Sequence, residues 1–349
     1  MVKSVTLKDV AKRVGVTAAA ASMALSGSDR ISDTTREAVK EAARELGYVP
    51  SSAGRALRNQ RAGAVALIVP NSSQHVFGHM YFMHVLTGVS ESANAHDTQV
   101  LVSTNADEAQ GVAAYERVMR SRSADGAIVT SAAIDDDNIQ RLVASGLPVV
   151  LIGNFPYLDD AVSVGIDDVT ATRRITEHLV EVHGRRNLLH VTGTLDHQTG
   201  VDRRQGFLDA VQAAGARGDI IEGDLSEQSG ALAVELALSS AEAGTPGVFP
   251  YDGVVFANDD MALGGMRILR SKGVAVPTDV SVVGFDDFGL ARVTTPGITT
   301  MRIPAEEMAR IATERLFGLI DGTADLAAPS HLELPVEFIA RASCGCADG

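Results

Sequence analysis

Hydrogen-bonding side chains directly follow most of the short apolar runs in this 349-residue sequence. They supply hydroxyls, amides, carboxylates, one guanidinium and two aromatic rings, at Asn71, Tyr81-Phe82, Thr130-Ser131, Asn154, Asp196 to Thr199, Arg203, Asn258 to Asp260 and Asp286-Asp287. Paired donors and acceptors with rings for stacking suit a polar small molecule such as a sugar. The acidic clusters come without a matching set of His and Cys, so no cofactor and no metal are expected.

The apolar runs predict the strands that position these groups. They cover 64–69, 100–102, 126–129, 149–152, 188–191, 253–256 and 281–284 and alternate with helical stretches such as 80–95. Continuous apolar strands alternating with helices predict parallel sheets covered on both faces. Residues 62–349 are too many for one such sheet, so two doubly wound lobes are expected. Because ligands bind at the carboxyl ends of parallel strands, the polar groups should converge there.

Several of these residues also allow a purely structural interpretation. Tyr81 and Phe82 fit a helix core, Arg203 a solvated helix face, and Asp286 or Asp287 a helix N-cap. His197 fits a pocket or a loop equally well. The run Asp135 to Asp137 and the pair His178 and His183 are predicted to be solvated.

Cysteine occurs twice, as Cys344 and Cys346 in the last six residues. A single residue between them does not match a structural zinc pattern, and the pair cannot staple a core. A reduced, frayed tail is therefore expected, in keeping with a reducing cytoplasm. No apolar run is long enough to cross a membrane and no secretory leader is evident, so a cytoplasmic location is expected.

Charge is distributed very unevenly along the chain. The net charge is −14, yet residues 1–61 hold eleven Lys/Arg and six Asp/Glu, a net of +5, and the remainder carries −19. A small basic head on a large acidic body indicates an anion-binding module joined to a domain that avoids polyanions.

The basic head has the pattern of three short helices. The first begins at Thr6 and ends at Gly15, the second runs from Ala18 to Leu25 after the N-cap candidate Thr17, and the third begins after Ser32. Val39, Ala42, Ala43 and Leu46 would form the buried side of the third helix. Two short helices joined by a turn containing Gly are typical of a helix-turn-helix.

The head and hinge closely resemble the lactose/galactose-repressor (LacI/GalR) family of bacterial transcriptional regulators. Matching features are Thr6-Leu7, Asp9 to Ala11, Gly15-Val16, Ser22, Thr35-Arg36 and Leu46-Gly47-Tyr48-x-Pro50. The resemblance implies an all-α DNA-binding head (1–48), a hinge helix (49–61) and a two-lobed α/β body like the periplasmic binding proteins (62–345). The implied lobes are 62–165 plus 293–323 and 166–292 plus 324–345.

By this resemblance, Thr17 to Leu25 is the recognition helix, lying in a major groove. Residues 18, 19 and 23, which face bases in the family, are Ala18, Ala19 and Met23 here, and none can make the bidentate bonds that read guanine or adenine. Thr17 and Ser22 remain available for phosphates. Thr6, Ser32 and Tyr48 are further expected DNA contacts.

The same resemblance implies a hinge that orders on the operator and inserts a leucine into the minor groove. The matching residues are Ala53, Arg55, Leu57 and Arg58, and Gly54 weakens the intrinsic helicity of the segment. The alternative interpretation is a basic tether.

In the body, Arg203-x-x-Gly206-Phe207 matches a family effector contact, and the matches around Asn258, Asp260 and Asp286 imply that these face the ligand. We expect Arg203 and Asp286 to serve the pocket rather than the fold. Departures from the family, including His79, His84 and Gly153-Asn154, leave the effector unidentified. The full expected effector set is Tyr81, Phe82, Thr130, His197, Thr199, Arg203, Asn258, Asp260 and Asp286.

These patterns predict a homodimeric regulator, most simply a repressor, that binds a pseudo-palindromic operator under control of a sugar-like effector. Alternatives are a nucleobase, nucleoside or protein co-regulator as effector, or a sugar-binding protein without DNA function. No G-x-S-x-G, Walker A or G-x-G-x-x-G motif follows a strand, so an enzyme is not expected.

Overall fold

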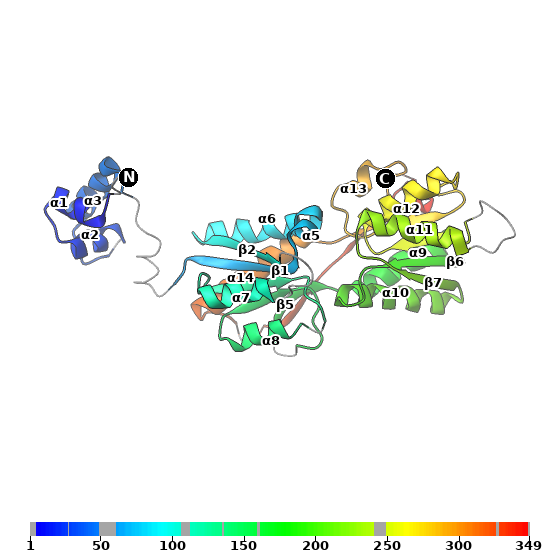
Figure 1. Cartoon of the computed structure of the whole chain (residues 1–349), viewed down its shortest axis with the longest axis horizontal. Coiled ribbons are helices and arrows are strands. Elements are labelled where there is room, and N and C mark those ends of the chain that lie inside the picture. The colour runs from blue at the N-terminus through cyan, green and yellow to red at the C-terminus, as the bar shows by residue number, and fades with distance from the viewer. Residues whose placement is uncertain are drawn as a thin grey trace. The chain divides into compact units, whose positions relative to one another are not determined.

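The structure is a computed structural model that describes residues 5–26, 28–48, 61–105, 112–134, 136–158, 161–240, 249–325 and 328–347. The chain divides into two compact units, Met1–Gly63 and Ala64–Gly349, and each is described by itself (Figure 1). The expected contacts Ala53, Arg55, Leu57 and Arg58 lie outside the described residues.

The first unit contains the three predicted helices, α1 (Leu7–Val14), α2 (Ala18–Leu25) and α3 (Asp33–Leu46). Each helix begins after the expected cap. The Thr6 amide donates to Asp9 Oδ2 over 2.9 Å, and Thr17 Oγ1 accepts from the Ala20 amide over 3.1 Å. Gly15 ends α1 with a φ of 78°, a left-handed conformation that favours glycine. The predicted boundaries of the first two helices are confirmed.

Small apolar residues hold the three helices together. The buried cluster consists of Val10, Ala11, Ala21, Ala24, Val39, Ala42 and Ala43, with Leu46 and Tyr48 packed at its edge. Because most of these side chains are alanine, the helices approach one another closely.

The first lobe of the body is built on a six-stranded parallel sheet in the order β11-β5-β4-β3-β1-β2. Its strands are β1 (Ala64–Ser72), β2 (Gln99–Asn105), β3 (Gly126–Thr130), β4 (Val149–Ile152), β5 (Val162–Ile166) and β11 (His331–Leu334). Alternate residues of β1 face opposite helix layers. Val65 and Leu67 pack with α6 (Met80–Ala95) and α14 (Ala305–Asp321), whereas Ala66 and Ile68 pack with α7 (Ala113–Ser121) and α8 (Asp137–Ala144).

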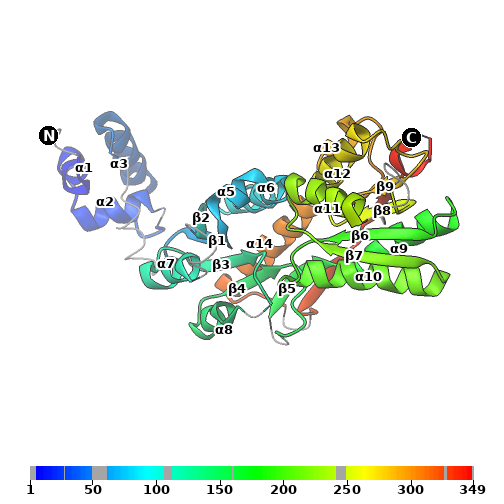
Figure 2. The ribbon, with the colours of Figure 1, turned by 45° about the vertical axis from the view of Figure 1, so that its right-hand side comes forward.

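The second lobe has a four-stranded parallel sheet in the order β7-β6-β8-β9 (Figure 2). The strands are β6 (Asn187–Thr192), β7 (Arg217–Glu222), β8 (Gly253–Phe256) and β9 (Ser281–Val283). The helices α9 (Asp168–Glu181) and α10 (Gln198–Ala214) cover one face, and α11 (Glu227–Ser240) and α12 (Asp259–Ser271) cover the other. Two doubly wound lobes therefore confirm the expected fold class.

The lobes exchange segments near the C-terminus in a way that corrects the predicted boundaries. Strand β11 pairs with β5, so residues 331–334 belong to the first lobe's sheet rather than to the second lobe. Ala291 of the short helix α13 (Leu290–Val293) and Ile298 pack in the second lobe's core, so that lobe extends past residue 292. At the crossing, β10 (Thr300–Arg302) and β12 (Glu337–Ile339) form an antiparallel pair.

The end of the chain is not a frayed tail, contrary to the sequence expectation. Residues Ala342–Cys344 form a short 3₁₀ helix, η2, whose Cys344 is fully buried (0% exposed) against the core. The remaining element, α5 (Ser73–Gly78), follows β1 directly. Across the part of the chain that the structure describes, no helix combines the length and apolar character needed to span a membrane.

Candidate effector site and DNA-binding unit

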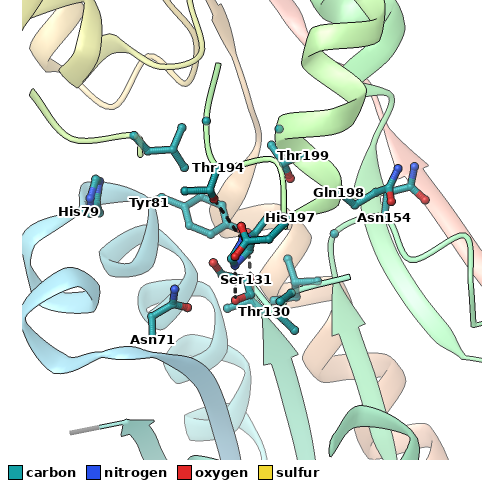
Figure 3. Close-up of a pocket in the computed structure, with 18 of the residues that line it drawn as sticks. Asn71, His79, Tyr81, Thr130, Ser131, Asn154, Thr194, His197, Gln198 and Thr199 are labelled. Atoms are coloured by element: carbon teal, nitrogen blue, oxygen red, sulfur yellow. Dashed lines mark hydrogen bonds and ion pairs between the residues drawn. The ribbon is translucent and has the colours of Figure 1, made fainter. Parts of the chain in front are cut away.

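A cavity of about 620 Å³ lies in the body between the two lobes, at the carboxyl ends of their strands. Figure 3 shows its lining: Asn71, Tyr81 and Thr130 come from the first lobe, and Thr194, His197 and Thr199 from the second. Eight of the nine expected effector residues line this cavity, namely Tyr81, Phe82, Thr130, His197, Thr199, Arg203, Asn258 and Asp286. The predicted convergence of strand ends therefore brings these residues together.

Arg203 lies at the wall of the cavity and is only 5% exposed. Its Nε donates to Asp168 Oδ1 over 2.8 Å, its Nη1 donates to the Ala257 carbonyl, and Nη1 lies 3.5 Å from Asp286 Oδ1. The guanidinium also stacks over the Phe285 ring, 3.7 Å from its centroid. Arg203 is thus a buried, multiply paired cation, and the solvated interpretation is wrong.

The spacing Arg203-x-x-Gly206-Phe207 has a structural reason. A Cβ on Gly206 would lie 2.2 Å from the Val169 carbonyl oxygen, so only glycine lets α10 pack this closely on α9. Phe207, one position on, is fully buried and stacks on His190 with ring centroids 5.0 Å apart. This packing carries Arg203 to Asp168 at the start of α9.

Asp286 occupies a left-handed backbone conformation, with a φ of 106°, directly after β9. Burial raises the pKa of its carboxyl to about 6, and Arg203 opposes that rise. Burial also raises the pKa of Asp168, again against the attraction of Arg203. Neither Asp286 nor Asp287 caps a helix as one interpretation suggested, because Gly289 takes the N-cap position of α13.

Tyr81 and Phe82 form an edge-to-face pair at the start of α6, with centroids 5.2 Å apart. The Tyr81 hydroxyl lies 3.1 Å from Thr130 Oγ1, and burial raises the Tyr81 pKa to about 12. Phe82 is 5% exposed and also belongs to the core of the first lobe. For Phe82 the core and cavity interpretations therefore both hold.

His197 connects the lobes at the edge of the cavity. Its Nδ1 lies 2.7 Å from Asp196 Oδ1, and its Nε2 lies 3.3 Å from the Ser131 carbonyl oxygen of the other lobe. Two further contacts cross between the lobes nearby, from the Ile134 amide to the Asp196 carbonyl (2.7 Å) and from Asn154 Nδ2 to Asp202 Oδ2 (3.1 Å).

Asp260 does not line the cavity, contrary to the expectation. It is the second residue of α12, and two positions along a helix are about 200° apart around its axis, so Asn258 and Asp260 face different ways. Asn258 lines the cavity and caps α12, accepting from the Met261 amide over 2.9 Å. The Asp260 carboxylate instead lies 3.7 Å from His79 Nδ1.

Sequence reasoning missed several acidic cavity residues, above all Asp168 and Asp224. Asp168 follows β5 and Asp224 follows β7, and the apolar runs of these two strands were not recognised. Asp136, from the run expected to be solvated, caps α8 and also lines the cavity. The rule of polar residues at strand ends would have found Asp168 and Asp224 if β5 and β7 had been predicted.

In the first unit, Thr17 and Ala19 are exposed, whereas Ala18, Ser22 and Met23 are half-buried. Ala21 is fully buried in the core of the unit, as expected of a residue present for packing. Among the other expected contacts, Thr6 and Ser32 act as helix caps, and Tyr48 packs on the edge of the core.

Comparison with known families decides the relationship of the chain. The family described as periplasmic binding proteins and sugar binding domain of the LacI family matches residues 62–342, and the bacterial regulatory proteins of the lacI family match residues 6–51. The chain belongs to the LacI family. It is therefore a DNA-binding transcriptional regulator with an effector-binding body.

Individual LacI-family members resemble it over almost their whole length. The transcriptional regulator CelR of Thermobifida fusca is 34% identical over 94% of this chain and 96% of its own. A solved CelR–cellobiose complex is 32% identical, with a TM-score of 0.72 over 97% of this chain and 99% of that one. A lac repressor dimer bound to operator and anti-inducer shares the fold, with 24% identity and a TM-score of 0.84 over 98% and 99%.

The relatives found for this LacI-family chain are transcriptional regulators rather than enzymes. The family relationship thus agrees with the function predicted from the sequence. It does not assign the ligand, the operator or the residues that contact them.

Proposed function

We propose that this regulator is controlled by a neutral sugar bound in the interlobe cavity. The observation that carries the proposal is the charge of the lining. Of the described residues lining the cavity, five are Asp, and Arg203 is the single Lys or Arg. Because Arg203 is already paired with Asp168 and Asp286, an anionic ligand would meet uncompensated negative charge. Sugar phosphates, sugar acids and nucleotides are therefore disfavoured.

The remaining lining suits a polyol. A volume of about 620 Å³ lies within the range of small-molecule sites. In the proposed complex Tyr81 and Phe82 offer ring faces for stacking, while Thr130, Thr199, Asn258 and His197 offer hydrogen-bonding groups. Asp286 and Arg203 would bind adjacent hydroxyls as charge-assisted acceptor and donor. The cellobiose complex of the relative CelR supports a sugar as the ligand class.

A thermal-shift screen of the full chain tests this proposal. We expect cellobiose or another neutral sugar to raise the melting temperature, since a ligand at 100 times its Kd stabilises the folded state by about 2.7 kcal/mol. Glucose 6-phosphate, gluconate, adenine and adenosine are the comparison ligands. A shift with a nucleobase or an anionic sugar, and none with neutral sugars, would reject the neutral-sugar assignment.

For DNA binding, we infer that α2 enters the major groove with Ala18, Ala19 and Met23 toward the bases and Thr17 and Ser22 toward phosphates. Ala18, Ala19 and Met23 can contact thymine methyl groups but cannot hydrogen-bond base edges. Leu57 of the proposed hinge would then supply a minor-groove wedge, flanked by Ala53, Arg55 and Arg58. Leu57→Ala should weaken operator binding by about 10- to 100-fold and change non-specific binding little, as a gel-shift titration would measure.

The proposed assembly is a homodimer formed through the body, because a pseudo-palindromic operator pairs with two-fold protein symmetry. Sedimentation of the full chain at micromolar concentration should give twice the 36.5 kDa mass of one chain. A monomer with and without operator DNA would be incompatible with this assembly.

A further inference from the structure

Two histidines and both cysteines meet at one point of the second lobe, away from the cavity. His178 lies in the last turn of α9 and His183 lies just beyond that helix, whereas Cys344 and Cys346 belong to the C-terminal segment. One potential ligand atom from each residue lies within 4.8 Å of all the others. We propose that these four side chains bind one Zn²⁺ ion as a structural His₂Cys₂ site.

The distances within the cluster fit a tetrahedral zinc ion. The two imidazole Nε2 atoms lie 3.1 Å apart, and His178 Nε2 lies 3.5 Å from both sulfur atoms. Cys346 Sγ is also 3.5 Å from His183 Nε2. With Zn–N of about 2.0–2.1 Å and Zn–S of about 2.3 Å, a tetrahedron separates two nitrogens by about 3.3 Å and a nitrogen from a sulfur by about 3.5 Å. The cluster therefore has nearly the spacing of a loaded site.

Hydrogen bonding alone does not account for this convergence. A ring nitrogen carries either one hydrogen or one lone pair, yet His178 Nε2 faces another ring nitrogen and two sulfur atoms at 3.1–3.5 Å. Thiols are weak donors and acceptors, so they gain little from this arrangement. A central cation that accepts an electron pair from each atom would satisfy all four at once.

The surroundings hold the cysteine segment in place before any ion binds. The Cys344 carbonyl accepts from Ser281 Oγ over 2.7 Å, and Ser343 Oγ donates to the Val282 carbonyl over 2.6 Å. The Thr299 hydroxyl lies 3.0 Å from Cys344 Sγ, where it can donate to a thiolate. These contacts fix the segment on strand β9 and give one ligand an outer hydrogen-bond partner.

Gly345, between the two cysteines, has a conformational role. Its φ is 110°, and a Cβ at this position would lie 3.1 Å from His183 Nδ1. Glycine therefore allows Cys344 and Cys346 to present their sulfur atoms on the same side as the imidazole. The sequence could not reveal the site from the Cys-x-Cys spacing, because a histidine ligand precedes Cys344 by 166 positions.

Ligand type selects the metal and the role. Two thiolates and two imidazoles are typical of zinc, and four protein ligands leave no open position for a substrate. On binding, each thiol loses its proton to solvent and the two thiolates neutralise the charge of the ion. The ion would tie the C-terminal segment to α9 next to Phe338 of the crossing strand β12, whose ring lies 4.7 Å from that of His178.

The test is metal content of the tag-free, reduced full chain after exposure to Zn²⁺ and dialysis, measured by plasma mass spectrometry. We expect about one zinc per chain. His183→Gln and Cys346→Ser change half-buried ligands, so they should leave the fold intact, and each should weaken zinc binding by about 100-fold or more. His96→Gln, at an exposed histidine paired with Glu314, is the matched control and should retain zinc.

Cobalt provides a second readout that does not depend on the variants. Co²⁺ added to the zinc-free chain should give the visible bands of tetrahedral cobalt and a thiolate charge-transfer band, both absent from Cys346→Ser. Failure of the reduced wild-type chain to take up Zn²⁺ would overturn the proposal. So would binding of equal strength by wild type, His183→Gln and Cys346→Ser, since the ion would then lie elsewhere.

Discussion

The guanidinium of Arg203 lies between two buried carboxylates, so its removal affects the fold as well as the cavity. The sequence led us to expect that Arg203 serves the pocket alone, and the burial of this ion pair corrects that expectation. An exposed arginine could be lost without consequence, whereas loss of this one leaves Asp168 and Asp286 without their cation.

Arg203→Ala should therefore lower the free energy of unfolding by about 3–5 kcal/mol, as well as abolish the effector response. Chemical denaturation of the full chain measures the first effect. Arg204→Ala, at the next and less buried position of α10, is the control and should stay within about 0.5 kcal/mol of wild type. An Arg203→Ala protein of wild-type stability would show that the ion pair contributes nothing to the fold.

A second residue-scale prediction concerns Asp286, whose pKa burial raises from 3.8 to about 6. Arg203, Asp168 and Asp260 act on it, the first lowering the pKa and the other two raising it. A raised carboxyl pKa means that the folded state holds the proton more tightly than the unfolded state. For this group alone, stability is therefore present at low pH and is lost as the pH rises from about 4 to about 6.

Effector binding should have the opposite pH dependence, because a sugar hydroxyl donates to the ionised Asp286 carboxylate. Affinity should be constant above pH 7 and fall below pH 6 by up to about tenfold per pH unit. Titration calorimetry from pH 5 to 8 with the sugar found in the screen measures this. Asp286→Asn should bind more weakly and lose the dependence; an unchanged pH profile in Asp286→Asn would assign it to another group.

At the scale of the element, α2 is a short helix with an exposed Ala19 and no long polar side chain. Ala19→Gln introduces a side chain that can bond adenine N6 and N7 together. We expect the preferred half-site to gain an adenine, with discrimination of about 1–3 kcal/mol, in selection from random duplexes. Glu41→Gln, exposed on α3, should select the wild-type sequence. Identical sites for wild type and Ala19→Gln would mean that α2 does not read bases.

Elements with a strong local signal were predicted well from sequence. Thr17 before an alanine run and Gly15 after an apolar face define α1 and α2, because caps and periodicity are properties of neighbouring residues. Strands β1, β3 and β8 are buried on both faces and were recognised by their continuous apolar residues.

Other elements carry too little local signal. Strand β7 is an edge strand whose sequence, Arg217–Glu222, is half polar, and β11 alternates polar and apolar residues over only four positions. Their identity depends on the sheet that they join. For the same reason the pairing of Arg203 with Asp168 and the meeting of His178 with Cys344 could not be predicted, since each depends on packing between distant segments.

At the scale of the whole molecule, the two lobes of the body touch through a few hydrogen bonds beside the cavity. A ligand that contacts both lobes favours the arrangement in which these bonds form. It can change operator affinity only by the difference in its affinity for the two arrangements. The interlobe hydrogen bonds and the effector therefore bias the same equilibrium.

Asn154→Ala removes one of these bonds, from Asn154 Nδ2 to Asp202 Oδ2. A hydrogen bond contributes about 0.5–1.5 kcal/mol, so the variant should bind the effector about 2- to 12-fold more weakly. It should also bind operator with changed affinity in the absence of effector, because the lobe equilibrium itself has moved. Fluorescence anisotropy with labelled operator measures both. Asn94→Ala, at an exposed residue of α6, is the control. If Asn154→Ala weakens only effector binding and leaves effector-free operator affinity unchanged, Asn154 is a ligand contact and the interlobe bond does not influence the switch.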